Sequence, residues 1–433
     1  MFKLDAHNAS PLVEVSAGLT TFFAMVYVLA ANPGILGKAG LPMGALFTAT
    51  AVGTIVATLI MAFGANLPFA VAPGMGLNQF FVVMATQMGF SWQQALTAVL
   101  VSGAFFVLLS VSPLREKVLR EVPKNLQHGV CAGIGIMIGY IGLHNGGVIV
   151  LGGSGPSLGD LAGGPALLVI VGLIVLGLLL ALKVRFAILL GIIITTILGI
   201  PLGVTDYSGL SGGFVSLPPA IGGIALKFDF SVLGSIEFWS VVLTLLFMEV
   251  VDGLAGFLGL FGVMGPDGER YRSKMGRAFV ADSLGVVAGS CLGLSPNTTY
   301  AESGAGVASG GRTGLTALVV AVCFFLALFI SPLFMMVPFA AVAPALVMVG
   351  LLMLQSMTKV DFGDHTESFP AFVVLIVIAL SWRISDGLAV GWIVFILMKV
   401  ASGRRRELTA TVWVVGIIFA LKMTSSFWTA ALL

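Results

Sequence analysis

The segment SPNTTYAESGAGVASGG, residues 295–311, interrupts a chain that is otherwise a succession of apolar stretches. It places an acid, Glu302, among glycines and small residues. A second acid, Asp252, lies inside the apolar stretch LTLLFMEVVDGLAGFLGLFG, residues 243–262. A charged side chain in hydrocarbon costs about 2.5–3.5 kcal/mol on insertion scales, so it persists mainly where it faces a polar cavity or a partner. The two acids therefore predict a substrate or ion site, the alternative being structural hydrogen bonds between helices.

The composition is that of a membrane protein. The chain has 433 residues, of which 58% are hydrophobic and 9% charged, whereas a soluble domain is about 25% charged. The net charge of +2 comes without a basic run that would suggest nucleic acid. The three cysteines are isolated and the four histidines lack metal-ligand spacing. We therefore expect no cofactor, no metal site and no nucleic-acid partner, but a protein embedded in a lipid bilayer.

Apolar stretches of about 20 residues, the length of a membrane-spanning helix, recur along the chain. Two further segments, 69–88 and 297–310, are broken by glycine, and counting both predicts 14 crossings. The other expected crossings are 14–31, 44–63, 93–112, 128–150, 164–183, 186–203, 238–263, 276–294, 313–333, 338–357, 367–383 and 385–402. The apolar stretch 408–428 is either an interfacial helix or an additional crossing.

Basic residues test this count, because cytoplasmic loops are enriched in Lys and Arg. All the clusters follow even-numbered crossings, which predicts a cytoplasmic N-terminus and an external 204–236 connection poor in Lys and Arg. The clusters are Arg115, Lys117, Arg120 and Lys124; Lys183 and Arg185; Arg270, Arg272, Lys274 and Arg277; and Arg404, Arg405 and Arg406.

The two broken segments resemble each other. PFAVAPGMGLNQFF (68–81) and TTYAESGAGVASGG (298–311) share a Gly-X-Gly core, at Gly74/Gly76 and Gly304/Gly306, displaced by 230 positions. Because an odd number of crossings, seven, separates the two halves, the second half is inverted relative to the first. Such repeats with matched broken segments are typical of secondary transporters whose site lies near the middle of the membrane. We expect a first repeat over 10–204, an external connection over 205–237, a second repeat over 238–402 and a C-terminal segment over 403–433.

The breaks suit a polar, flat ligand. Each frees backbone groups and presents the N-terminus of a half-helix, which is tolerated in a membrane where it lines a cavity. Asn78, Thr298 and Thr299 could add hydrogen bonds. Glu249 and Asp252 are three residues apart, roughly on one helical face, and two such acids in low dielectric are not expected to be ionised together. A proton carrier requires such an acid, one that can hold a proton. The alternatives are that Glu249 only supports Asp252 and that the glycines only pack.

At these residues the chain resembles the nucleobase–cation symporter-2 superfamily, and within it the AzgA-like branch of purine permeases. The resemblance covers roughly residues 10–402. It rests on four segments: GLTTFFAMVYVLAANPGIL, GANLPFAVAPGMGLNQFF, ADSLGVVAGSCLGLSPNTTYAESGAGVASGGRTGLTA and SFPAFVVLIVIALSWRISDGLAVGW.

The resemblance implies an all-α fold of 14 segments, a 7+7 inverted repeat with a core domain (crossings 1–4 and 8–11) and a gate domain (5–7 and 12–14), in which the third and tenth segments contain short strands. It also implies that the acids of the eighth and tenth crossings bind the base. The branch usually reads like VDLFDTVGTL in the eighth crossing, where this chain has MEVVDGLAGF, so Glu249 replaces an Asp while Gly253 and Gly256 replace Thr. This departure leaves the preferred purine open. The expected substrate contacts are Asp252, Glu302, Gly74, Met75, Gly76, Asn78, Thr299, Ser303 and Gly304; the expected proton-coupling residues are Glu249, Asp252 and Glu302.

The leading hypothesis is therefore an importer of adenine, guanine or hypoxanthine, coupled to protons, in a bacterial plasma membrane, with a homodimer as one assembly to consider. The alternative is an anion or other small-solute transporter on the same fold, against which the two acids argue. A membrane enzyme is disfavoured, because neither a metal-ligand cluster nor a nucleophile–base pair accompanies the acids.

Overall fold

The computed structural model describes residues 2, 4, 9–112, 123–152, 155–184, 187–207, 213–264, 271, 273–300, 302–381 and 384–431. Of the basic residues in the predicted cytoplasmic loops, Arg115, Lys117, Arg120, Arg185, Arg270 and Arg272 lie outside this description. The fold is predominantly helical, as expected for a chain whose backbone polar groups must be satisfied within each membrane-spanning segment.

Seven helical stretches among the described residues are both long and apolar enough to cross a membrane. They are Pro11–Ala39, Met43–Ala65, Trp92–Val111, Lys124–Asn145, Gly164–Ala181, Gly314–Met335 and Phe339–Lys359. Met75–Thr86, Ala187–Gly199 and His365–Ser381 are apolar but shorter. The fold is that of a polytopic membrane protein, while the number of 14 crossings stays a prediction.

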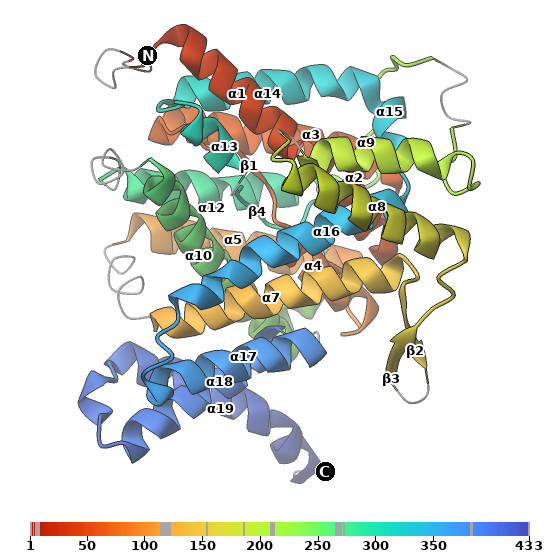
Figure 1. Cartoon of the computed structure of the whole chain (residues 1–433). Coiled ribbons are helices and arrows are strands. Elements are labelled where there is room, and N and C mark those ends of the chain that lie inside the picture. The colour runs from red at the N-terminus through yellow and green to blue at the C-terminus, as the bar shows by residue number, and fades with distance from the viewer. Residues whose placement is uncertain are drawn as a thin grey trace. The chain divides into compact units, whose positions relative to one another are not determined.

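The chain divides into two compact units, and Figure 1 labels their elements. Unit 1 comprises residues 1–111 and 142–345, and unit 2 comprises 112–141 and 346–433, so that α7 and α16 each contain a boundary. The elements of unit 1 are α1 (Pro11–Met25), α2 (Val28–Leu36), η2 (Gly37–Ala39), α3 (Met43–Ile60), η3 (Met61–Ala65), β1 (Val71–Pro73), α4 (Met75–Thr86), α5 (Trp92–Val111), the end of α7 (Lys124–Asn145), β2 (Ile149–Gly152), β3 (Gly155–Leu158), α8 (Gly164–Ala181), α9 (Ala187–Gly199), η5 (Phe230–Gly234), α10 (Ile236–Val263), α12 (Met275–Cys291), β4 (Asn297–Thr299), α13 (Ser303–Ala308), α14 (Gly314–Ala327), η6 (Leu328–Ile330), α15 (Ser331–Met335) and the start of α16 (Phe339–Leu354).

The two broken segments meet inside unit 1. β1 and β4 pair antiparallel, with Ala72 opposite Thr298, and each strand leads into a short helix, α4 or α13. The strands occur where Pro73 and Pro296 prevent a continuous helix. The N–H of Gly74 donates to the carbonyl of Pro296 (3.0 Å), which extends the pairing beyond the strands. The predicted strand-and-half-helix arrangement is therefore confirmed.

The structure aligns the two breaks differently from the Gly-X-Gly motif. The residues that precede α4 and α13, at their N-caps, are Gly74 and Glu302. The glycine motif aligned Gly74 with Gly304 instead. In the fold, then, the acid of one break occupies the place that a glycine occupies in the other.

The first predicted crossing, 14–31, lies within the apolar stretch Pro11–Ala39, which contains a turn between two helices. α1 ends at Met25 and α2 begins at Val28, and Val26 and Tyr27 form a turn between them. No proline or glycine marks this turn, which is why the sequence pattern reads as a single span.

A buried carboxylate fastens α1 to α14. Glu14 is 0% exposed and accepts hydrogen bonds from the backbone N–H groups of Arg312 (2.9 Å), Thr313 (3.3 Å) and Thr316 (3.2 Å). The hydroxyls of Thr313 (2.9 Å) and Thr316 (2.6 Å) also donate to it. Helix N-termini leave backbone donors without intrahelical partners and attract negative charge. Glu14 therefore caps α14 from a neighbouring helix.

Unit 2 contains the start of α7 and the end of α16, followed by η7 (Gln355–Lys359), α17 (His365–Ser381), α18 (Ile384–Ala401), η8 (Arg405–Glu407) and α19 (Ala410–Ala431). Close helix packing relies on small residues. A Cβ at Gly129 of α7 would come within 2.4 Å of the carbonyl oxygen of Ala371 in α17. The C-terminal apolar stretch is the helix α19, held to α18 by a hydrogen bond from Trp392 Nε1 to the carbonyl of Val412 (3.0 Å).

A charged cluster joins the helix ends of unit 2. Lys399 is 1% exposed and pairs with Glu367 (2.7 Å) and Glu407 (2.8 Å). Arg404 pairs with Asp364 and with Glu407. The hydrogen bonds from Arg404 hold the pKa of Asp364 and of Glu407 below their ordinary values.

This cluster predicts a pH-dependent contribution to stability. A carboxyl whose pKa is lower in the folded than in the unfolded state stabilises the fold above its unfolded pKa, about 4, and loses that contribution as the pH falls. Arg404→Ala should therefore lower the melting temperature of the detergent-solubilised protein at pH 7 more than near pH 3. The exposed Arg406 supplies the control Arg406→Ala. An Arg404→Ala effect that is equal at the two pH values would contradict this assignment.

Candidate functional site

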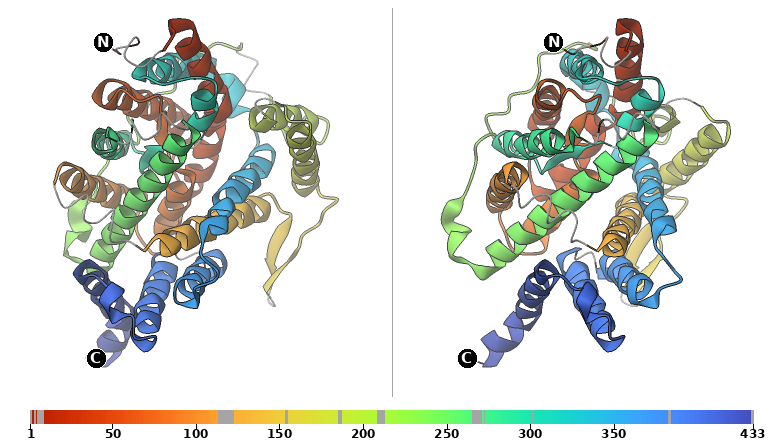
Figure 2. Two further views of the ribbon diagram at one scale, coloured as in Figure 1. Left: turned by 60° about the vertical axis from the view of Figure 1, so that its left-hand side comes forward. Right: turned by 90° about the vertical axis from the view of Figure 1, so that its left-hand side faces the viewer.

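The two acids singled out in the sequence come from elements that converge on the strand pair. α10, the long green helix in both views of Figure 2, packs against β4 and α13. It carries Asp252, which is partly exposed and faces the hydroxyl of Thr298 in β4. Glu302, also partly exposed, stands at the N-cap of α13, a short way beyond the end of β4 at Thr299. Both acids lie close enough to Tyr300 to interact with it electrostatically.

Two tyrosines, which the sequence reading did not single out, complete this side of the site. Tyr27, in the turn between α1 and α2, donates a hydrogen bond from Oη to Glu302 Oε1 (2.6 Å). Tyr300 donates from its hydroxyl to the carbonyl oxygen of Pro73 in β1 (2.6 Å). Both phenols are buried. Tyr27 thus orients the acid, whereas Tyr300 braces the strand that precedes α4.

A third acid, Asp282 of α12, lies behind the strand pair and was also missed. It is 1% exposed and accepts a hydrogen bond from the hydroxyl of Thr299 (2.9 Å). It interacts electrostatically with both Glu249 and Asp252. A Cβ at Gly253 would come within 3.0 Å of Asp282 Oδ2, so the glycine leaves room for this carboxyl.

Glu249 and Asp252 share α10 but have different surroundings. Glu249 is 1% exposed and accepts a hydrogen bond from Ser102 of α5 (2.8 Å) through Oε1. Its Oε2 is buried without a hydrogen-bond partner among the described residues. Glu249 also has a like-charge neighbour in Asp282. The spacing of residues along α10 could not indicate this neighbour, because Asp282 belongs to α12. Asp282 of α12 thus interacts with two carboxyls of α10, those of Glu249 and Asp252.

Aromatic side chains make the surroundings of these acids apolar. Phe257 of α10 stacks on Phe69 (ring centroids 6.2 Å apart) and meets Phe279 edge to face (5.1 Å). Phe279 in turn meets Phe106 of α5 edge to face (6.0 Å). All four rings are buried. In such surroundings, electrostatic interactions between the acids are stronger than in water.

Besides Glu302, three of the expected substrate contacts have hydrogen-bond partners inside the protein. Asn78 of α4 is 0% exposed and accepts a hydrogen bond from Ser295. Thr299 is engaged with Asp282, and the hydroxyl of Ser303 accepts from the N–H of Ala70 (3.0 Å). Asn78 and Ser303 join the two breaks in the present conformation, whereas Thr299 joins β4 to α12. To contact a ligand through the same atoms, they would have to exchange these bonds.

The remaining expected contacts lie at the starts of the two half-helices. Gly74 packs on β4, since a Cβ there would come within 2.8 Å of Thr298 Cγ2. Met75 is 6% exposed, and Gly76 and Gly304 are partly exposed in the first turns of α4 and α13. The structure thus brings all the expected residues into one region of unit 1, with Gly74 in a packing position.

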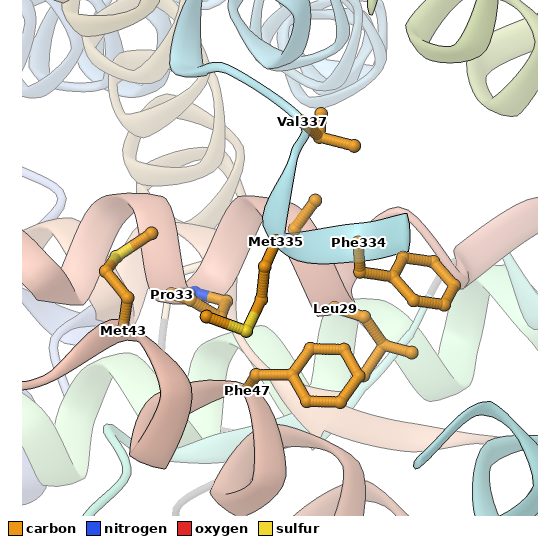
Figure 3. Close-up of a pocket in the computed structure, with 8 residues that line it drawn as sticks. Leu29, Pro33, Met43, Phe47, Phe334, Met335 and Val337 are labelled. Atoms are coloured by element: carbon orange, nitrogen blue, oxygen red, sulfur yellow. The ribbon is translucent and has the colours of Figure 1, made fainter. Parts of the chain in front are cut away.

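A separate pocket of about 110 Å³ lies between α2, α3 and the segment that follows α14. Figure 3 shows the side chains of Leu29, Phe47 and Met335 pointing toward one another in it. Its lining is apolar throughout: Leu29, Ala30, Pro33, Met43, Phe47, Phe334, Met335 and Val337. Without a polar side chain it offers little to a hydrogen-bonding solute, so the acid-bearing strand crossing is the stronger candidate site.

Comparison with known proteins gives concordant results. A family model described as "Permease family" matches residues 12–390. The chain is 38% identical over 432 residues to the guanine/hypoxanthine permease PbuO of Bacillus subtilis, covering 98% of this chain and 99% of that one. It is 37% identical over 429 residues to the adenine permease AdeP of Escherichia coli, covering 98% and 95%.

Solved structures show the same fold at low identity. The transmembrane domain of the cyanobacterial bicarbonate transporter BicA superposes with a TM-score of 0.63 at 17% identity, covering 88% of this chain and 96% of that one. The murine anion transporter Slc26a9 in its inward-facing state gives 0.62 at 11% identity, covering 90% and 68%. These likenesses confirm the predicted polytopic transporter fold, while the division into seven plus seven crossings stays a prediction.

Proposed function

The chain belongs to the permease family of the nucleobase–cation symporter-2 superfamily and is a multi-pass membrane protein, and on that premise we propose that it imports purine nucleobases together with protons. The proposed substrates are adenine, guanine or hypoxanthine. The protein would lie in a bacterial plasma membrane with its N-terminus in the cytoplasm. The core would move against the gate in an elevator-like cycle to expose the site to each side in turn.

The observation that carries this proposal is the convergence of Asp252 and Glu302 on the β1–β4 crossing. A purine has N–H donors and ring-nitrogen or carbonyl acceptors around a flat ring. Carboxylates accept from the N–H groups, and the backbone N–H groups that begin α4 and α13 can donate to the acceptors. Relatives named as guanine/hypoxanthine and adenine permeases support the same class of substrate.

Proton coupling is proposed from the acids themselves. Glu249, Asp252, Asp282 and Glu302 lie in one region of unit 1, and no ion pair to any of them is found among the described residues. Like charges in low dielectric are not all ionised at once, so at least one acid can carry a proton. A base entering from outside would bind to that protonated state, and base and proton would leave together into the cytoplasm.

The fold alone would also permit an anion transporter, since BicA is named a bicarbonate transporter and Slc26a9 an anion transporter. At this site, however, Asp252 and Glu302 stand where the half-helices meet. Carboxylates there repel an anion but can accept hydrogen bonds from a neutral base. The residues of the site thus favour a nucleobase over an anion.

A binding panel separates these two functions. Purified protein in detergent should bind tritiated hypoxanthine, guanine or adenine, and an excess of unlabelled purine should displace the label. Uracil, bicarbonate and sulfate at the same excess should displace little. A protein that binds none of the purines, and instead exchanges labelled bicarbonate or sulfate in liposomes, would overturn the proposal.

A further inference from the structure

The turn between α1 and α2 brings a tyrosine to the candidate site from a third direction. Tyr27 is 2% exposed, and its hydroxyl reaches Glu302 Oε1 at 2.6 Å across 275 positions of sequence. A neutral phenol that donates to a carboxylate forms one of the stronger hydrogen bonds in proteins. Among the described residues, Tyr27 is the side chain found to donate a hydrogen bond to Glu302.

This bond leaves the two oxygens of Glu302 unequal. Oε1 accepts from Tyr27, so one of its lone pairs is occupied and the carboxyl plane is fixed relative to α13. Among the described residues no other side chain is found to donate to Oε2, although the backbone N–H of Glu302 itself also interacts with the carboxyl. A carboxylate held in one orientation loses less side-chain entropy when a ligand binds than one that samples several.

Contacts other than the Tyr27 hydrogen bond hold α13 in place. This six-residue helix is too short to be stable alone, but α1 holds it along its length. A Cβ at Gly306 would lie 2.1 Å from Thr21 Oγ1 and 2.6 Å from the carbonyl oxygen of Ala17, so the two helices touch at the backbone. Beyond its C-terminal end, the N–H groups of Arg312 and Thr313 donate to Glu14.

We propose that Tyr27 is a positioning residue of the nucleobase site, whose hydroxyl holds Glu302 so that Oε2 is presented to an N–H group of the base. The proposal rests on the proposed function. It extends the site from the two breaks to the α1–α2 turn. Because backbone contacts fix α13, removing one hydroxyl should disturb the carboxyl and spare the helix.

Tyr27→Phe tests this assignment, with Tyr207→Phe as the matched control because Tyr207 is 59% exposed and lies in a loop. Initial rates of labelled purine uptake into proteoliposomes should show a KM raised at least fivefold in Tyr27→Phe. The maximal rate should stay within about twofold of the wild type, with unchanged thermal unfolding. Tyr207→Phe should match the wild type in both parameters.

Replacing Tyr27 by 3-fluorotyrosine provides a second test if the phenylalanine variant does not fold. It keeps the ring and hydroxyl but makes the hydroxyl more acidic, so KM should change, whereas the same replacement at Tyr207 should have no effect. An unchanged KM in Tyr27→Phe, or in the fluorotyrosine protein, would overturn the positioning role. A wild type that binds no purine would instead overturn the proposed function, so the two failures can be told apart.

Discussion

Asp252→Asn and Glu302→Gln should each lower purine uptake at least tenfold while the protein remains in the membrane. Each amide keeps the shape of the acid but removes its charge and replaces one acceptor oxygen with a donor. A buried ligand group left without its partner costs about 1–3 kcal/mol, and about 1.4 kcal/mol corresponds to tenfold in binding. The loss should appear in purine binding as well as in transport.

The exposed Glu237, at the start of α10, supplies the control. Glu237→Gln removes a carboxylate from the same helix as Asp252 and should leave uptake unchanged. Uptake is to be normalised to the amount of each variant in the liposomes. Normal uptake by both amide variants of the candidate acids would exclude them as the site.

Glu14→Ala should prevent recovery of a stable protein. The change removes the buried acceptor of the N–H groups of Arg312 and Thr313 and of the Thr313 hydroxyl. The N–H and hydroxyl of Thr316 also lose the carboxylate, but they keep bonds to the backbone carbonyls of Thr313 (3.2 Å) and Glu14 (3.3 Å). Each orphaned group costs about 1–3 kcal/mol, against a total stability of about 5–15 kcal/mol for a typical protein. We expect a large fall in the melting temperature, or aggregation on extraction, measured by fluorescence-detected size exclusion after heating.

Glu14→Gln should be milder, because the amide oxygen still accepts from the first turn of α14. The control Glu237→Ala removes an exposed acid and should melt like the wild type. A Glu14→Ala protein that melts with the wild type would show that α14 is fastened to α1 by packing alone.

Local chemistry made part of this arrangement predictable. Pro73 and Pro296 disfavour a helix and have glycines nearby, and this combination locates both breaks, where the strands and half-helices occur. Asp252 and Glu302 are conspicuous because an acid in an apolar stretch needs a reason. These features depend on residues near one another in the chain, where propensity and cost of burial suffice.

Other parts of the site depend on contacts between distant segments. Asp282 lies in an apolar stretch that reads as an ordinary crossing, and only its bond to Thr299 places it behind the strands. Tyr27 lies in a turn that no proline or glycine marks. Its role depends on Glu302, 275 positions away. The sequence does contain one signal for Asp282, because it is an acid inside the predicted crossing 276–294. The cost of an acid in an apolar stretch, which singles out Asp252, applies equally to it.

The burial of Asn78 illustrates a different limit. Its type and position next to a break suggest a ligand contact, but its oxygen accepts from Ser295 in the other broken segment. Sequence spacing places Asn78 near the break but does not show where its side chain points. It therefore cannot distinguish an amide that faces a cavity from one that joins two segments.

The central claim is that the acids couple purine entry to protons, and accumulation in proteoliposomes tests it most directly. With an acidic exterior and no sodium gradient, labelled purine should accumulate above its external concentration. A protonophore should abolish that accumulation, and purine addition should make the external medium more alkaline. Accumulation that follows an imposed sodium gradient and ignores the protonophore would contradict the account.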